Sequence, residues 1–261
     1  MTDQPDRPAF LDDPKWSTDY LPKMGGEADP DRLSMVTQRL QAASATKELS
    51  PRRQAIKDLA DATRLLTDRL VATDAPEDVI LAATAEVAAA AERFAGFHQG
   101  TLYGFSEAAN AGAHESPLFD HSPMIGIGNP LAPPLTISEV DGVIHAEAWF
   151  GQAYEGPPAC VHGGYVACAF DEVLGATQSL SGAPGMTGTL SVRYEKPTPL
   201  QTPLHFEGRL VGVERRKIFV EGVCYAGDVL TATAKGTFIS MKPGAFLDII
   251  AEREARQAEQ R

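Results

Sequence analysis

The chain has 261 residues and a formal net charge of −12, with 43% hydrophobic and 22% charged residues. This composition is typical of an ordinary globular protein of one or two domains. So negative a charge argues against nucleic acid or a membrane surface as a partner, because both need a basic face on the protein. A small anionic ligand remains compatible, since a few local Arg and Lys side chains can hold a phosphate.

The sequence carries no sign of a membrane, a disulfide framework or a metal. No apolar run reaches the ~18 residues of a membrane span, and the acidic, Pro-rich start resembles neither a signal nor a transit peptide. We therefore expect a cytoplasmic protein. Cys160, Cys168 and Cys224 are scattered, and the histidines show no HxxxH spacing. We expect reduced thiols, no metal site and no cofactor.

The N-terminal third is expected to be an arm followed by helices. Residues 1–30 are rich in Pro and Asp, which predicts an extended or disordered arm. From 31 to 115 we predict a helical region, with a first helix around 33–43, a second beginning at Ser50-Pro51 and a third at Ala75-Pro76. The second helix carries an apolar face, which consists of Ile56, Leu59, Leu66 and Leu70. These helices are expected to form a module or an arm that packs on the rest.

The pattern changes after an irregular segment over residues 96–134. From residue 135 to 241 the order of elements is β-β-α-β-β-β-β, with a hairpin at Asp141-Gly142 and one helix from Tyr165 to Ser179. One helix cannot cover both faces of such a sheet, which favours an antiparallel sheet curled around it and further burial by dimerisation. We predict an α+β domain over residues 116–246 and a charged C-terminal helix over 247–261. The later strands are expected at Thr187–Tyr194, Leu204–Val213, Lys217–Tyr225 and Val229–Ser240.

The main chemical signal is the pattern H-G-G-x6-D, from His162 to Asp171. Two glycines at the start of a helix expose backbone N–H groups, which together with the helix dipole attract a developing oxyanion. Asp171 follows about two turns later in an otherwise apolar helix, where a carboxylate is costly to bury without a task or a partner. The alternative without a catalytic role is that His162 and the glycines only cap the helix and that the Asp171 side chain is solvated.

The stretch YEGPPACVHGGYVACAFDEVLG, followed by TGTLSVRYEKPTPL, resembles the PaaI-like branch of hotdog-fold acyl-CoA thioesterases. The resemblance covers about residues 125–241 and implies a hotdog fold, thioester hydrolysis and a homodimer or a dimer of dimers. It implies that Asp171 is the general base or nucleophile, that the Gly163 N–H polarises the carbonyl, and that His162 orders the turn beside Gly164. Thr187 and Thr189 lie where the family places a hydroxyl.

One position, Gly156, departs from that pattern, and another, Glu172, directly follows Asp171. Some members carry an Asn six residues before the His, where this chain has Gly156, so that contact is expected to be missing. Glu172 lies about 100° around the helix from Asp171, and we interpret it as a solvated or ion-paired neighbour. Alternation along the strand predicts that Thr187 and Thr189 point to the same face, so either could supply the hydroxyl.

A basic turn, Arg215-Arg216-Lys217, separates two strands. It is either a solvated hairpin tip or a contact for the phosphates of coenzyme A, which would enter only as part of the substrate. The hypothesis is hydrolysis of an acyl-CoA to free acid and coenzyme A. The alternatives are a non-catalytic acyl-CoA sensor and a hotdog-fold hydratase.

Overall fold

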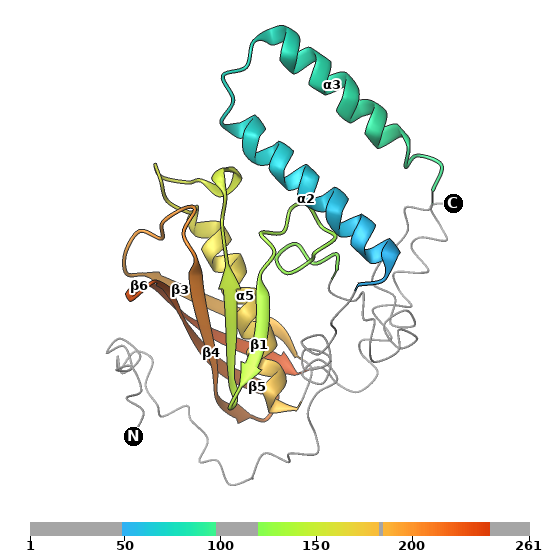
Figure 1. Ribbon diagram of the computed structural model, residues 1–261. Coiled ribbons are helices and arrows are strands. Elements are labelled where there is room, and N and C mark those ends of the chain that lie inside the picture. The colour runs from blue at the N-terminus through green and yellow to red at the C-terminus, as the bar shows by residue number, and fades with distance from the viewer. Residues whose placement is uncertain (1–48, 98–119, 183–184, 241–261) are drawn as a thin grey trace.

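The computed structural model describes residues 49–97, 120–182 and 185–240 (Figure 1). The expected N-terminal arm, the first helix and the C-terminal helix over 247–261 lie outside these described residues. Among the described residues, no helix is both long enough and apolar enough to cross a membrane.

One antiparallel sheet forms the body of the domain. Its strand order is β1-β2-β4-β5-β6-β3, so β3 crosses over to pair with β6 at the far edge. The Asp141-Gly142 turn between β1 and β2 has both residues at positive φ, as a two-residue hairpin requires. The strands are β1 (Thr136–Val140), β2 (Val143–Ala148), β3 (Gly185–Tyr194), β4 (Leu204–Glu214), β5 (Lys217–Ala226) and β6 (Val229–Ser240).

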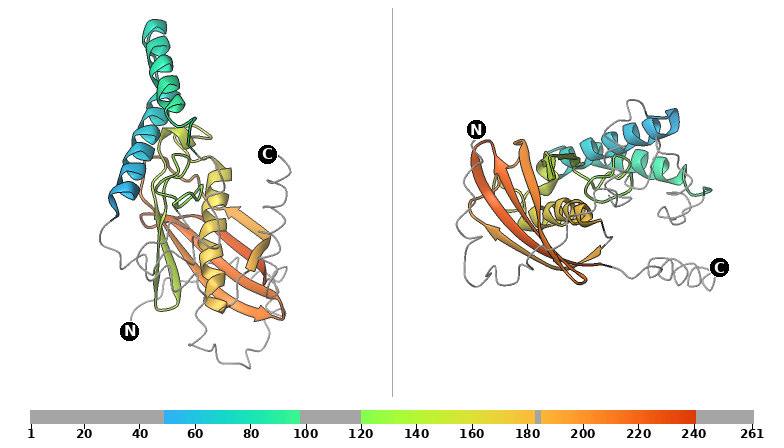
Figure 2. Two further views of the ribbon diagram at one scale, coloured as in Figure 1. Left: turned by 90° about the vertical axis from the view of Figure 1, so that its right-hand side faces the viewer. Right: turned by 90° about the horizontal axis from the view of Figure 1, so that it is seen from below.

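The helix α5 (Gly163–Gln178) lies along the concave face of the sheet, which curls around it (Figure 2). Its inward face is apolar and packs against the side chains of five strands, which places the hydrophobic core between helix and sheet. The fully buried apolar residues of this helix are Val166, Ala169, Phe170, Val173 and Leu174. This is the α+β arrangement of a sheet wrapped around one helix that the sequence predicts.

Three glycines on neighbouring strands allow α5 to approach the sheet closely. Gly208 pairs with Gly222 across β4 and β5, and Gly236 lies on β6. A Cβ atom at Gly222 would lie 3.1 Å from Cδ2 of Leu174, and one at Gly236 would lie 3.3 Å from Cδ1 of the same side chain. The absence of side chains at these positions therefore sets the distance between helix and sheet.

The helix α2 (Pro51–Val71) begins as predicted, with the Ser50 side chain accepting a hydrogen bond from the Arg53 N–H. Its docking differs from the prediction. Of the apolar face that we expected to pack, Leu59 is 49% exposed, Leu66 is 39% exposed and Leu70 is 58% exposed. The prediction of an apolar contact is wrong for these three residues, because the helix faces the domain with its polar side.

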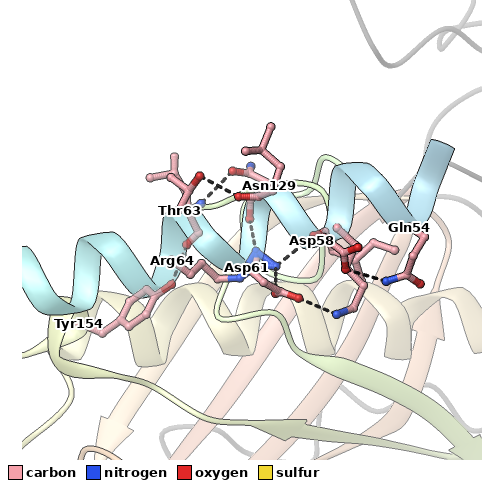
Figure 3. A network of polar contacts seen from close by, with 11 residues as sticks. Gln54, Asp58, Asp61, Thr63, Arg64, Asn129 and Tyr154 are labelled. Atoms are coloured by element: carbon pink, nitrogen blue, oxygen red, sulfur yellow. Dashed lines mark hydrogen bonds and ion pairs between the residues drawn. The ribbon is translucent and has the colours of Figure 1, made fainter. Parts of the chain in front are cut away.

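Polar contacts attach α2 to the segment 120–135 and to the short helix η6 (Gln152–Tyr154), as Figure 3 shows around Arg64. Arg53 donates two hydrogen bonds to Asp120, at 2.8 and 2.9 Å, from side chains that are only 16% and 13% exposed. Arg64 donates to the carbonyl oxygens of Ile127 and Asn129. Beyond this contact, α3 (Glu77–Glu92) buries no residue in the single chain.

Candidate functional site

The site begins at the N-terminus of α5, where His162 is the capping residue. Its Nδ1 accepts a hydrogen bond from the Gly164 N–H at 3.0 Å, which fixes the ring against the first turn. The first N–H groups of a helix have no partner within the helix. Because the His162 side chain accepts from the Gly164 N–H, the Gly163 N–H remains available as a donor, as the resemblance implies.

The backbone before the cap is held by its neighbours. The His162 N–H donates to the Tyr154 carbonyl at 2.9 Å, and the Val161 N–H donates to the Thr198 carbonyl. Gly156 lies directly against this backbone, because a Cβ atom there would be 2.7 Å from Cα of His162. An Asn at position 156 would not fit this loop, so the departure from the family pattern has a steric cause.

Asp171 lies two turns further along α5 and meets β3. The Thr187 hydroxyl donates a hydrogen bond to Oδ1 of Asp171 at 2.8 Å. This contact orients the carboxylate and leaves Oδ2 for another partner. Both residues are exposed in the single chain, so one chain alone does not bury the carboxylate.

A β-bulge at Gly188 separates the two threonines. Thr187 pairs with the buried Phe238, whereas Thr189 pairs with Thr237, the next residue on β6. Directly paired residues lie on the same face of a sheet, and successive residues lie on opposite faces. The prediction that Thr187 and Thr189 share a face is therefore wrong, because the extra residue reverses the alternation. Thr187 faces α5 and Asp171, and Thr189 faces the opposite side.

A cavity of about 330 Å³ opens beside Asp171 and Thr187. Its remaining lining is mostly apolar or small, from the segment 120–135, the second half of α5 and the strands β1, β3 and β6. These residues are Ile125, Ile137, Gly175, Ala176, Gln178, Ser179, Gly185, Met186 and Phe238, with Glu172 beside Asp171. Polar groups beside apolar side chains suit a ligand whose reactive group is polar and whose tail is not.

Glu172 is not the solvated neighbour that the sequence suggested. It lies mostly buried at the cavity wall, 3.4 Å from the Ser122 hydroxyl, which donates to its Oε2. Burial, together with the nearby Asp171 carboxylate, raises the pKa of Glu172 above 4.5. The prediction failed because helical geometry gives the angle between two residues but not the loop that covers one of them.

The two ends of the motif do not meet within one chain. Gly163 and Asp171 are eight residues apart on α5, which corresponds to about 12 Å along the axis. Near the first turn, the Tyr194 hydroxyl donates to the Gly163 carbonyl at 2.7 Å, so β3 contacts both ends of the helix segment.

The basic turn Arg215-Arg216-Lys217 joins β4 to β5 at the end of the sheet where β3 begins. Lys217 pairs with Ile239, which pairs with Met186. The turn is thus two strands away from β3, about 10 Å. Arg216 Nε donates to the Ser240 carbonyl at 3.0 Å. The turn does not line the cavity, and its role as a phosphate contact remains a prediction.

A solved structure described as a thioesterase superfamily protein is 31% identical to this chain, with a TM-score of 0.61. The match covers 70% of this chain and 94% of that one. The chain belongs to the thioesterase superfamily. Residues 120–240 make up less than half of the 261 residues, so this match must extend beyond the sheet domain. The family relationship therefore includes more than the hotdog fold.

Curated relatives match a shorter part. The human acyl-coenzyme A thioesterase THEM5 is 29% identical over 107 residues, which is 41% of each chain. The mouse acyl-coenzyme A thioesterase THEM4 is 32% identical over 110 residues, 41% of this chain and 44% of its own. The chain thus spans less than half the length of these relatives. No family model matches the chain.

The sequence did not single out several residues of this candidate site. Ser122 and Ile125 lie in the segment predicted only to be irregular, and Tyr194 was predicted only as the last residue of a strand. No local pattern marks a loop that folds back over a helix. Phe238 lies on a predicted strand, but the adjacent Ile239 is also apolar, so alternation alone did not single it out.

Proposed function

We propose that this protein hydrolyses acyl-CoA thioesters to a free acid and coenzyme A. The observation that carries the proposal is the hydrogen bond from Thr187 to Asp171 in the wall of a cavity that both polar and apolar side chains line. The capped helix start at His162 supports it, since it presents a Gly N–H to an oxyanion. The names of the curated relatives agree with this activity.

In this proposal Asp171 takes a proton from water while the water oxygen attacks the thioester carbon. The oxyanion receives the Gly163 N–H, and the carbon–sulfur bond breaks to release the thiolate, which needs no strong general acid. Direct attack by Asp171 would give a mixed anhydride that water then hydrolyses. Both routes use the same carboxylate, which Thr187 holds in place.

The proposal requires two chains. A donor and a base must both lie within about 3 Å of one carbonyl group, and one helix separates them by far more. The edge strand β3 offers unpaired backbone groups and exposed side chains such as Met186, at 57%, and Tyr194, at 52%. We propose a homodimer, or a dimer of dimers, in which each chain gives its helix start to the other's Asp171. A cytoplasmic location is part of this proposal.

Release of free thiol from a panel of acyl-CoAs tests the activity. Asp171→Asn should lower kcat at least ~10²-fold with substrate affinity within a few fold, as expected for loss of a general base. Asp228→Asn, at the exposed β5–β6 turn, is the matched control and should retain full turnover. Binding without thiol release would favour a sensor, and conversion without thiol release would favour a hydratase.

Mixed dimers test the shared site. Gly163→Pro removes the donor N–H at a position where Pro is tolerated, and Asp171→Ala removes the base. Each variant alone should be nearly inactive. After co-unfolding and refolding, half of the dimers are mixed with one intact site, which should restore about a quarter of wild-type activity. No recovery in verified mixed dimers would place the whole site within one chain.

A further inference from the structure

We propose a second site in this chain, a binding site for a zinc ion on the outer face of the sheet. The protein ligands are His145 on β2 and His205 and Glu207 on β4. Their side chains alternate with the buried residues Ile144, Ala146 and Phe206, so they point away from α5 and from the cavity beside Asp171. The site is therefore independent of the proposed hydrolysis.

The strand register brings the three ligands together. His145 pairs directly with Glu207, and Glu147 pairs directly with His205. Side chains that face each other across an antiparallel pair lie about 5 Å apart at Cβ, and diagonal neighbours remain within reach of long side chains. Residues 60 positions apart in sequence thus form one cluster, which spacing along the chain cannot reveal.

The distances within this cluster suit a zinc ion. Nδ1 of His145 lies 3.3 Å from Nε2 of His205, and Oε1 of Glu207 lies 3.6 Å from the same Nε2. Two ligands at 2.0–2.1 Å from a tetrahedral ion are about 3.3 Å apart. All three ligand atoms lie within 4.8 Å of one another, so a small rotation of the Glu207 side chain closes the third edge. Water would fill the fourth position.

Glu147 orients His205 for zinc binding. Its Oε1 accepts from Nδ1 of His205 at 2.6 Å, which leaves the lone pair of Nε2 directed at the other two ligands. Zinc-bound histidines usually donate their second N–H to a carboxylate, a backbone carbonyl or water, which fixes the tautomer and the ring orientation. The carboxylate, the imidazole and the ligand cluster therefore reproduce the arrangement of a supported metal ligand.

Electrostatics also favour a cation between these groups. With Nδ1 donating to Glu147, both Nε2 of His205 and Oε1 of Glu207 are acceptors, yet they lie 3.6 Å apart. A cation bound between these two atoms would interact favourably with both of them. Arg209 pairs with the other carboxylate oxygen of Glu207, Oε2, at 3.2 Å, so it leaves Oε1 for the ion.

Zinc binding to the full-length protein, freed of metal by a chelator and titrated with ZnCl₂, tests this site. We expect about one Zn²⁺ per chain. Glu147→Gln should weaken binding 10–100-fold, the usual effect of losing a supporting carboxylate. His145→Gln and His205→Gln should each weaken it by more than Glu147→Gln does. His121→Gln, outside the cluster, is the matched control and should bind as the unchanged protein does.

A second measurement identifies the ligands directly. Co²⁺ in place of zinc should give the intense visible bands of a tetrahedral ion without a sulfur charge-transfer band, and His205→Gln should abolish them. Zinc bound with unchanged affinity by His145→Gln and His205→Gln, or a sulfur band from a cysteine, would overturn the proposal. No saturable zinc binding would overturn it as well. Unchanged circular dichroism of each variant verifies folding.

Discussion

The helices α5 and α2 have similar sequence patterns and opposite packing. Both carry apolar residues at helical spacing, but α5 buries its apolar face against the sheet, whereas α2 buries only Ala60. The contacts of α2 are made by Arg53, Arg64 and Asp68 instead. Periodicity therefore predicts that a helix forms but not which face it docks with.

The two kinds of contact differ in what they stabilise. Apolar burial under α5 holds the whole domain together, because the sheet and the helix share one core. The few polar contacts of α2 attach it to particular atoms of the domain, and an element with so little apolar burial opens locally at low cost. We therefore expect α5 to determine global stability and α2 to determine the position of what it touches.

The residues that α2 contacts are connected to the proposed active site. Arg53 and Arg64 hold the segment 120–129, which supplies Ser122 to Glu172 and Ile125 to the cavity wall. Asp68 accepts from the Ala153 N–H of η6, and the next residue's carbonyl accepts from His162. Helix α2 thus supports two sides of the proposed active site without lining it.

The largest expected effect is on the buried helix. Leu174→Ala should lower the free energy of unfolding by about 2–5 kcal/mol, because it leaves a cavity between α5 and the sheet. Urea unfolding with a constant m-value measures it. Leu65→Ala on α2, where the side chain is 51% exposed, is the matched control. Equal losses of unfolding free energy in the two variants would contradict the contrast between the buried face of α5 and the exposed face of α2.

A smaller effect is expected where α2 docks. Arg53→Met should cost about 1.5–3 kcal/mol of docking free energy, since it removes a charge-assisted pair with Asp120. Hydrogen exchange of the α2 amides should speed up while that of α5 stays unchanged. KM for an acyl-CoA should rise with kcat retained, because the cavity wall loses its support. Arg52→Met, on the exposed neighbour, is the control, and identical exchange for both variants would sink the prediction.

A pH dependence should come from Glu172. Its raised pKa in the folded chain means that it holds a proton where the unfolded chain, with a pKa near 4.5, has lost it. This stabilising contribution is fully present below the unfolded pKa and is lost as the pH rises through the folded pKa. Unfolding free energies measured across that window should fall less steeply with pH in Glu172→Gln than in the unchanged protein. Parallel slopes would show that the carboxyl titrates normally.

The smallest effect is expected on the outward face of α2. Leu70→Gln should change the free energy of unfolding by no more than about 0.5 kcal/mol, because this side chain is 58% exposed and both residues favour a helix. Thermal unfolding of the isolated full-length protein measures it. A loss above about 2 kcal/mol would show that another surface covers this face in solution.

Local sequence signals predicted the elements of the sheet domain well. The Asp141-Gly142 hairpin, the Ser50 cap and the order of strands are confirmed, with boundaries moved by no more than two residues. Each depends on neighbours in the chain. The antiparallel sheet around α5 followed from the same signals, because one apolar helix needs a sheet on which to bury its face.

Features that depend on residues far apart in the chain were not predicted from the sequence. The bulge at Gly188, the cover over Glu172 and the polar docking of α2 each involve a strand or loop far away in the chain. The His145 and His205 pair is another case, because only the register of β2 and β4 joins them. No spacing rule along one strand contains that information.

The glycines under α5 limit where room for a larger ligand, such as the acyl group of the proposed substrate, can come from. Gly208, Gly222 and Gly236 carry no side chain to shorten, and α5 already rests on the backbone there. Mutation can fill that side of the molecule but cannot deepen it. None of these three glycines lines the cavity beside Asp171, so room for a longer or bulkier acyl group has to come from side chains that do, such as Ile125 and Met186. Met186 lies on β3, and Ile125 lies on the segment 120–129 that α2 holds in place.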